Sequence, residues 1–139
     1  MTRRPGGATL ANTPHESRPS IRIATVCIDC ADVDAMAEFY GRLLGWDVTL
    51  REPHWVLMRD PAGGTGLSFQ AEEHYRSPQW PEEAGGQDKM IHLDIKVDDL
   101  ASAVAHALAS GARLAEHQPR RRVRVLLDPA DHPFCLFLD

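Results

Sequence analysis

The sequence predicts an α+β fold in which two βαβββ modules form a curved mixed sheet, a half-barrel, with flanking helices. Two observations predict it. The order strand, helix and three strands occurs twice in 139 residues. Landmarks of the two halves also recur at offsets between 66 and 68 residues, which indicates an internal duplication. These landmarks are Asp32 and Asp99 before the helices, Gly45 and Gly111 after them, and the turns that begin with Asp60 and Asp128.

The first module is expected to span about residues 21–71. Its β-branched start predicts a strand over 21–28. Asp32 is placed to cap a helix, because its short carboxylate accepts from the free N–H groups of the first turn. Apolar residues at helical spacing then follow up to Leu44, and Gly45 ends the helix. Further strands are expected over 46–50, 55–59 and 66–71, with a turn at 60–64.

The second module is expected to span about residues 90–139. A polar linker broken by prolines, residues 72–89, precedes it. The same reasoning predicts a strand over 90–97, a helix over 100–110 that Asp98 or Asp99 caps, and strands over 112–117, 122–127 and 134–138. Residues 1–20 have no apolar periodicity, so we expect a flexible N-terminal tail followed by a single domain over 21–139.

Composition excludes several classes of protein. Hydrophobic residues at 43% and charged residues at 25% are typical of a soluble globular domain. The formal net charge of -5 argues against nucleic acid as a partner, because such proteins need clustered excess cations. No apolar stretch is long enough to span a bilayer, and Arg3 and Arg4 are not followed by an apolar segment. We therefore expect no membrane association and a cytoplasmic location.

Two short motifs have alternative interpretations. Cys27 and Cys30 form a C-x-x-C within an extended segment, where residues three apart point to opposite faces. A disulfide or a shared metal site fits that geometry poorly, so we expect buried structural thiols. The basic run 120–122 with Arg124 is either a solvated hairpin turn or an anion contact for a carboxylate or phosphate ligand.

Three segments resemble the vicinal oxygen chelate superfamily, and in particular its glyoxalase/bleomycin-resistance protein family. They are residues 32–46, with Asp32, Phe39-Tyr40 and Leu44-Gly45, then residues 92–100, and the Asp-Pro turn and last strand at 128–135. The resemblance covers about residues 21–139 and is nearest to the subgroup called glyoxalase-like domains.

This resemblance implies where a metal would be bound. Metal enzymes of the superfamily hold one divalent ion with His, Gln or Glu from the first and fourth strands of each half. The matching positions here are Thr25, one residue among 67–70, His92 and Cys135. Only His92 is a usual ligand at its position, so we expect no bound metal. If a metal is bound, His92, Cys135 and Gln70 are its predicted ligands.

Three functions stay open at this point. The first is metal-free binding or sequestration of a small molecule, as in the resistance proteins of the superfamily. The second is a metal-dependent lyase, isomerase or dioxygenase acting on a small oxygenated substrate. The third is metal-free catalysis with His92 as a base and Cys135 as a nucleophile. The predicted ligand-binding residues are Trp55, Phe69, Gln70, Trp80, His92, Arg124 and Cys135.

Several of these residues also have a purely structural interpretation. Trp55 and Phe69 fit a hydrophobic core, Trp80 fits a contact at a sheet edge, and His92 fits a hydrogen-bonded strand histidine. Because relatives often pair and symmetric pairing is the commonest oligomer, we also expect a homodimer.

Overall fold

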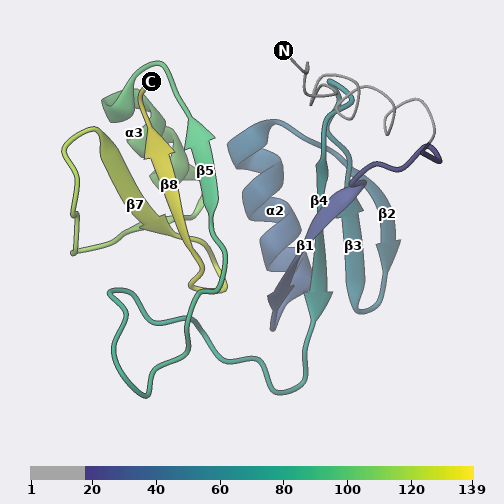
Figure 1. The fold of residues 1–139 in the computed structure, drawn as a ribbon, viewed down its shortest axis with the longest axis horizontal. Helices are drawn as coiled ribbons and strands as arrows, with labels where there is room; N and C mark the ends of the chain where they lie inside the picture. The colour runs from purple at the N-terminus through teal and green to yellow at the C-terminus, as the bar shows by residue number, and fades with distance from the viewer. Residues whose placement is uncertain (1–17) are drawn as a thin grey trace, which may run out of the picture.

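The protein forms two modules joined by a long linker in the computed structural model, which describes residues 18–139 (Figure 1). The first contains β1 (Thr25–Cys30), α2 (Val33–Leu44), β2 (Val48–Glu52), β3 (Trp55–Met58) and β4 (Gly66–Ala71). The second contains β5 (Leu93–Lys96), α3 (Leu100–Ser110), β6 (Arg113–Leu114), β7 (Val123–Leu127) and β8 (Pro133–Phe137). The predicted tail, residues 1–20, lies outside the described residues except for 18–20, which are exposed.

Each module has its own four-stranded mixed sheet. The strand order is β1-β4-β3-β2 in the first sheet and β5-β8-β7-β6 in the second. In both sheets the first strand pairs in parallel with the last, and the remaining pairs are antiparallel. This confirms an α+β fold of two βαβββ modules. The two sheets are separate from each other, so β1 and β5 are both edge strands.

Both helices begin and end where the sequence predicts. The Asp32 carboxylate accepts from the N–H groups of Asp34 and Ala35, and the Asp99 carboxylate accepts from that of Ser102. These contacts satisfy N–H groups that a helix leaves without internal partners. Gly45 follows α2 with a φ of 71°, in the left-handed region where a glycine carries no steric cost.

Several strands are shorter than the sequence suggests, and pairing explains why. β1 begins at Thr25 and not at residue 21, because its partner β4 starts at Gly66, the residue opposite Thr25. β5 begins at Leu93 and not at residue 90, because Met90 has a φ of 60° and leaves the extended conformation. β2 begins at Val48 and β6 covers only 113–114, so these segments pair over less of their length.

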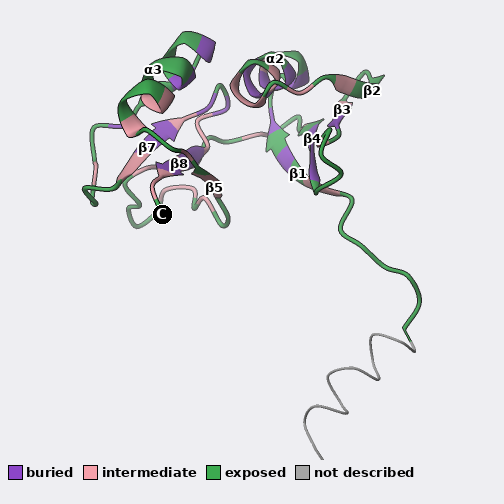
Figure 2. Ribbon diagram, turned by 90° about the horizontal axis from the view of Figure 1, so that it is seen from above, coloured by how far each residue is buried: buried purple, intermediate pink, exposed green. Residues whose placement is uncertain are grey.

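The helices lie on the same side of the two sheets and leave the opposite faces open (Figure 2). Strand register fixes which residues face the helices, because directly paired residues share a face. Phe69, opposite Ile28 and Val56, belongs to the core under α2. Phe134 and Leu126 form the matching row under α3. One continuous cluster of buried side chains joins the helix-facing sides of both modules.

Tyr40 joins the two modules. It lies on α2, is 1% exposed, and donates its hydroxyl hydrogen to Asp128 Oδ2 across the interface at 2.7 Å. Its ring stacks on Phe69 of its own module at 5.4 Å between centroids and meets Phe134 of the other module at 6.5 Å. A buried hydroxyl needs a hydrogen-bond partner, and Tyr40 finds it only when the two modules lie in this arrangement. The packing of its ring against both modules favours the same arrangement.

Asp128 also holds its own turn, since its other oxygen accepts from the N–H groups of Ala130 and His132. Burial raises the pKa of Asp128, while the hydrogen bonds from Tyr40 and the turn oppose this shift. Burial, followed by the nearby Asp128, raises the pKa of Tyr40 well above its usual value. Tyr40 therefore stays a hydrogen-bond donor throughout the physiological range of pH.

We expect Tyr40→Phe to lower the free energy of unfolding by about 1–3 kcal/mol, because it leaves the buried Asp128 carboxyl without one of its donors. Urea unfolding followed by circular dichroism measures this loss. Glu38→Gln is the control on the same helix, where the exposed pair with Arg42 should change stability by less than about 0.5 kcal/mol. Equal stability of Tyr40→Phe and the parent protein would contradict the role given to this contact.

Candidate functional site

A cavity of about 660 Å³ lies between the two modules. This volume is within the range of pockets that take drug-sized ligands. Three parts of the protein line it: β1 on one side, the linker and the start of the second module on another, and the Asp128 turn with Tyr40 at the interface. The lining comprises residues 26–29, Tyr40, 72–76, Pro78, 87–93 and 132–133.

Contacts between the linker and the second module close one side of this cavity. Tyr75 donates its hydroxyl hydrogen to the C=O of Ala130, and Ser77 Oγ donates to Asp131 Oδ2 at 2.8 Å. His132 Nε2 lies 2.6 Å from the C=O of Asp29 on β1. A carbonyl only accepts, so Nε2 carries the hydrogen in this contact. The turn 130–132 therefore connects to both the linker and β1.

Burial, followed by the charge of Asp128, raises the pKa of Tyr75. Its phenol stays protonated at neutral pH and acts in the cavity wall as a donor. Tyr75 Oη also lies 3.2 Å from His132 Nε2, so His132, Tyr75 and the Asp29 carbonyl form one hydrogen-bonded group at the wall. Residue type alone does not reveal this group, because its members come from three distant segments.

His92 lines the cavity, and the other six predicted ligand-binding residues lie outside its lining. Trp55 and Gln70 are paired with each other on the open face of the first sheet, next to Asp29. Gln70 Nε2 donates to Glu72 Oε1 at 2.8 Å. These two residues are near the cavity but do not form its surface, and their binding role stays a prediction.

Phe69 and Arg124 face the helices. Phe69 is 0% exposed in the core. Arg124 is paired with the buried Leu136, and its guanidinium donates to the backbone carbonyl groups of residues 120, 121 and 123. Arg124 thus closes the turn at 120–123, which agrees with the interpretation of the basic run as a hairpin turn. Trp80 lies on the linker, where its Nε1 donates to the C=O of His117 at 3.2 Å.

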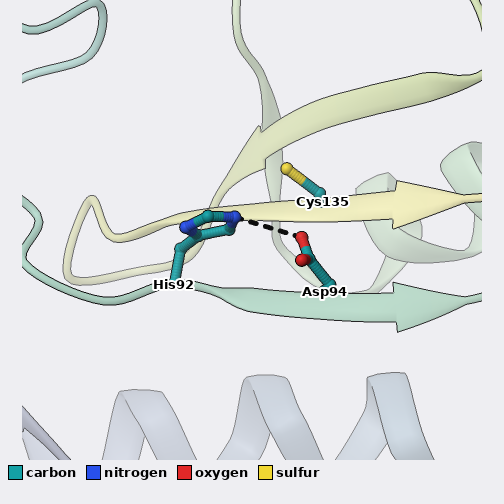
Figure 3. Close-up of side chains that lie close together, drawn as sticks. All are labelled: His92, Asp94 and Cys135. Atoms are coloured by element: carbon teal, nitrogen blue, oxygen red, sulfur yellow. Dashed lines mark ion pairs between the residues drawn. The ribbon is translucent and has the colours of Figure 1, made fainter.

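His92 and Cys135 lie together with Asp94 at the edge of the second sheet (Figure 3). One ligand atom from each residue falls within 4.8 Å of the others, and His92 Nε2 is 3.1 Å from Asp94 Oδ1. Asp94 pairs directly with Cys135 across β5 and β8. Sequence reasoning missed Asp94, although its position two residues after His92 placed it on the same face of the strand.

The first module has an equivalent group at a constant offset of 67 residues: Thr25, Cys27 and Ser68. Cys27 pairs with Ser68 as Asp94 pairs with Cys135, and Thr25 Oγ1 is 3.0 Å from Ser68 Oγ. The expectation of buried structural thiols is wrong for Cys27, which is exposed because its side chain faces the open side of the sheet. The expectation holds for Cys30, which is buried. Burial raises the pKa of its thiol to about 12.

The donor set does not fit a hard divalent cation. Thr25 and Ser68 offer neutral hydroxyls that bond each other, and Gln70 belongs to the other module. Burial, followed by the nearby Asp94, raises the pKa of the Cys135 thiol, so the thiol keeps its proton at neutral pH. A protonated thiol is a weak ligand and a weak nucleophile. The same shift argues against Cys135 as a catalytic nucleophile.

Comparison with known proteins places this geometry in a family. Residues 25–137 match the family model described as a glyoxalase-like domain. A glyoxalase/bleomycin resistance protein/dioxygenase family enzyme from Burkholderia phytofirmans PsJN is 25% identical, with a TM-score of 0.63 over 85% of this protein and 98% of that one. A search of curated proteins found no significant match.

Two more distant structures show the fold alone. A glyoxalase I from Leishmania major is 21% identical, with a TM-score of 0.58 over 86% of this protein and 87% of that one. An antibiotic binding protein from Streptomyces sp. CB03234 is 16% identical, with a TM-score of 0.58 over 87% and 98%. Within residues 18–139, neither helix is long and apolar enough to cross a membrane.

We expect Mg²⁺, Mn²⁺ and Ni²⁺ at millimolar concentration to leave the melting temperature of the protein unchanged at pH 7. The reason is that the positions 25, 68 and 135 offer only hydroxyls and a protonated thiol. Differential scanning fluorimetry, with elemental analysis of the dialysed protein, measures this. One equivalent of retained metal that Cys135→Ser or Asp94→Asn removes would contradict the prediction.

Proposed function

The chain belongs to the family of glyoxalase-like domains, and from this premise we propose that it binds or sequesters a small molecule without a bound metal. The observation that carries the proposal is the cavity of about 660 Å³ between the modules. It has the volume of a ligand site, while three of the four positions that match metal ligands of the superfamily carry hydroxyls or a protonated thiol. Binding a small molecule needs a cavity of this volume but does not need a metal site.

The fold by itself does not choose between binding and catalysis, because both a glyoxalase I and an antibiotic binding protein share it. The choice rests on the chemistry of the site. A metal-free enzyme would need an activated nucleophile or an oriented base. The thiol of Cys135 is protonated and lies beside the Asp94 carboxylate, which disfavours a thiolate further. These properties support binding over covalent catalysis.

The alternative is a metal-dependent lyase, isomerase or dioxygenase, and one observation favours it. His92, Asp94 and Cys135 bring nitrogen, oxygen and sulfur within 4.8 Å of one another. A cation there would supply Lewis-acid chemistry to an oxygenated substrate. The metal titration described above separates the two functions, because only the alternative requires retained metal that depends on Asp94 and Cys135.

The cysteines bear on the compartment in which the protein acts. All three are free thiols, and a reducing compartment keeps thiols in that state. This supports the cytoplasm as the proposed location.

We also propose a homodimer, because Ile21 and Ile23 are 82% and 72% exposed before β1, and a second copy would shield them. Light scattering on the purified protein should give twice the monomer mass, falling to the monomer in Ile21→Ser/Ile23→Ser. A monomeric parent protein would contradict the pairing.

We expect Ile91→Ser to weaken ligand binding about tenfold, because Ile91 is 63% exposed within the cavity wall and offers apolar contact to an occupant. The measurement is the shift of melting temperature across a panel of aromatic drugs. Tryptophan fluorescence is a poor reporter here, since no tryptophan lines this cavity.

The matched control is Leu50→Ser on β2, where a leucine of 47% exposure lies away from the cavity. Its melting-temperature shifts should equal those of the parent protein. A panel in which no compound stabilises the parent protein, or in which Ile91→Ser and Leu50→Ser behave alike, would count against binding in this cavity.

A further inference from the structure

The inner edge of β1 lacks a partner strand. β1 ends the order of the first sheet, and among the strands of residues 18–139 it is hydrogen-bonded only to β4. β5 ends the second sheet in the same way, and the two edge strands are not paired with each other. Free strand edges invite pairing with other molecules, so folded proteins usually cover, shorten or charge them. The edge of β1 instead forms one wall of the cavity between the modules.

The alternation of the backbone shows which main-chain groups of β1 face the cavity. The N–H groups of Gly66 and Glu72 on the β4 side donate to the C=O groups of Ala24 and Cys30, each at 2.9 Å. Successive residues of a strand direct these groups to opposite sides, so Cys27 and Asp29 direct theirs away from β4. The contact from His132 Nε2 to the C=O of Asp29 agrees with this direction.

Two residues therefore present free backbone to the cavity. The C=O of Asp29 is taken by His132, but its N–H is not, and no hydrogen bond described for residues 18–139 uses the N–H or C=O of Cys27. Both residues are exposed, so these main-chain groups are open to a ligand. These three groups form the pattern of donor, acceptor and donor that one edge of an extended peptide matches.

The surroundings of this edge define the rest of the occupant. Across the cavity, Met90 and Ile91 are 83% and 63% exposed and offer apolar contacts. The charged lining has four carboxylates and two cations: Asp29, Glu72, Glu73 and Asp88 against Arg76 and Lys89. Lys89 also pairs with Glu82 and lies over the ring of Trp80, so its charge is already partly met within the protein. The lining thus favours a cationic ligand with apolar groups.

We propose that the occupant of this cavity is a short, cationic, extended peptide or peptide-like molecule that adds to β1 as a strand and pairs with the backbone of Cys27 and Asp29. The inference rests on the proposed binding function and names its ligand class. Backbone pairing supplies the affinity, alternate apolar side chains contact Ile91 and Met90, and the cationic ones meet the carboxylates of the lining.

The test uses acetyl-Val-Lys-Val-Lys-amide as the probe, with isothermal titration calorimetry on the parent protein. Two N-methylated analogues of the probe, which are isomers of each other, carry methyl groups on the backbone nitrogens of its first and third residues or of its second and fourth residues. Only one of these alternating sets of N–H groups faces β1 in a paired strand. We expect one isomer to lose about tenfold in affinity and the other to bind like the probe. Replacing its lysines by glutamates should weaken binding similarly.

A pair of variants at Cys27 tests the same contact from the protein. Cys27→Pro removes the outward N–H, which β4 does not use, and proline is tolerated at such positions of an edge strand. Cys27→Ser keeps the N–H and removes only the thiol. We expect Cys27→Pro to weaken the probe about tenfold and Cys27→Ser to leave it unchanged. Because the N-methyl isomers use the parent protein, the test does not depend on the folding of the proline variant.

Four results would overturn the inference. Equal binding of both N-methyl isomers would show that strand pairing is absent. If the probe does not bind but aromatic drugs stabilise the parent protein more than Ile91→Ser, the proposed binding function stands and the peptide class of ligand is rejected. A dimer that Cys27→Pro converts to a monomer would show that a second copy covers the edge. If neither probe nor drugs bind, the proposed function fails as well.

Discussion

The hydrogen bond between Tyr40 and Asp128 is the constraint on which the arrangement of the two modules depends. It joins a helix of the first module to a turn of the second, 88 residues apart, and both residues are 1% exposed. Within residues 18–139 no strand pairing connects the two sheets, so the modules are held together by this contact, the rings packed around it, and the hydrogen bonds of His132 and His106 to backbone carbonyls of the first module. The cavity lies directly beside it, with Tyr40 in its wall.

The two modules have the same order of elements, but equivalent residues in them make different contacts. Asp60 and Asp128 each accept from the N–H two residues later, so both turns are closed in the same way. Asp60 is half-buried and serves only its turn, whereas Asp128 is buried and also binds Tyr40. A duplicated turn has thus become part of the interface in one copy. Burial of its carboxyl has an energetic cost, which the three hydrogen bonds offset.

The same asymmetry appears in the two groups at the strand edges. His92, Asp94 and Cys135 keep side chains that can bind metals, while their counterparts Thr25, Cys27 and Ser68 do not. A pocket between modules needs suitable ligands from both sides to hold a hard cation, and here only one side offers a histidine. In the described residues both sides retain a strand edge without a partner strand, and the proposed recognition by the backbone of β1 does not depend on side-chain identity.

The sequence by itself determined the elements, the duplication and the family, because these depend on local patterns: Asp32 and Asp99 as caps, Gly45 as a stop, and landmarks about 67 residues apart. Through the resemblance to this family, it also predicted that Thr25 and Cys135 stand where related enzymes have metal ligands. It could not place the cavity, since Tyr75, His132 and Asp29 come from distant segments and meet only through the packing of the modules. Phe69 and Arg124 were candidates by residue type, and only strand register decided that they face the helices.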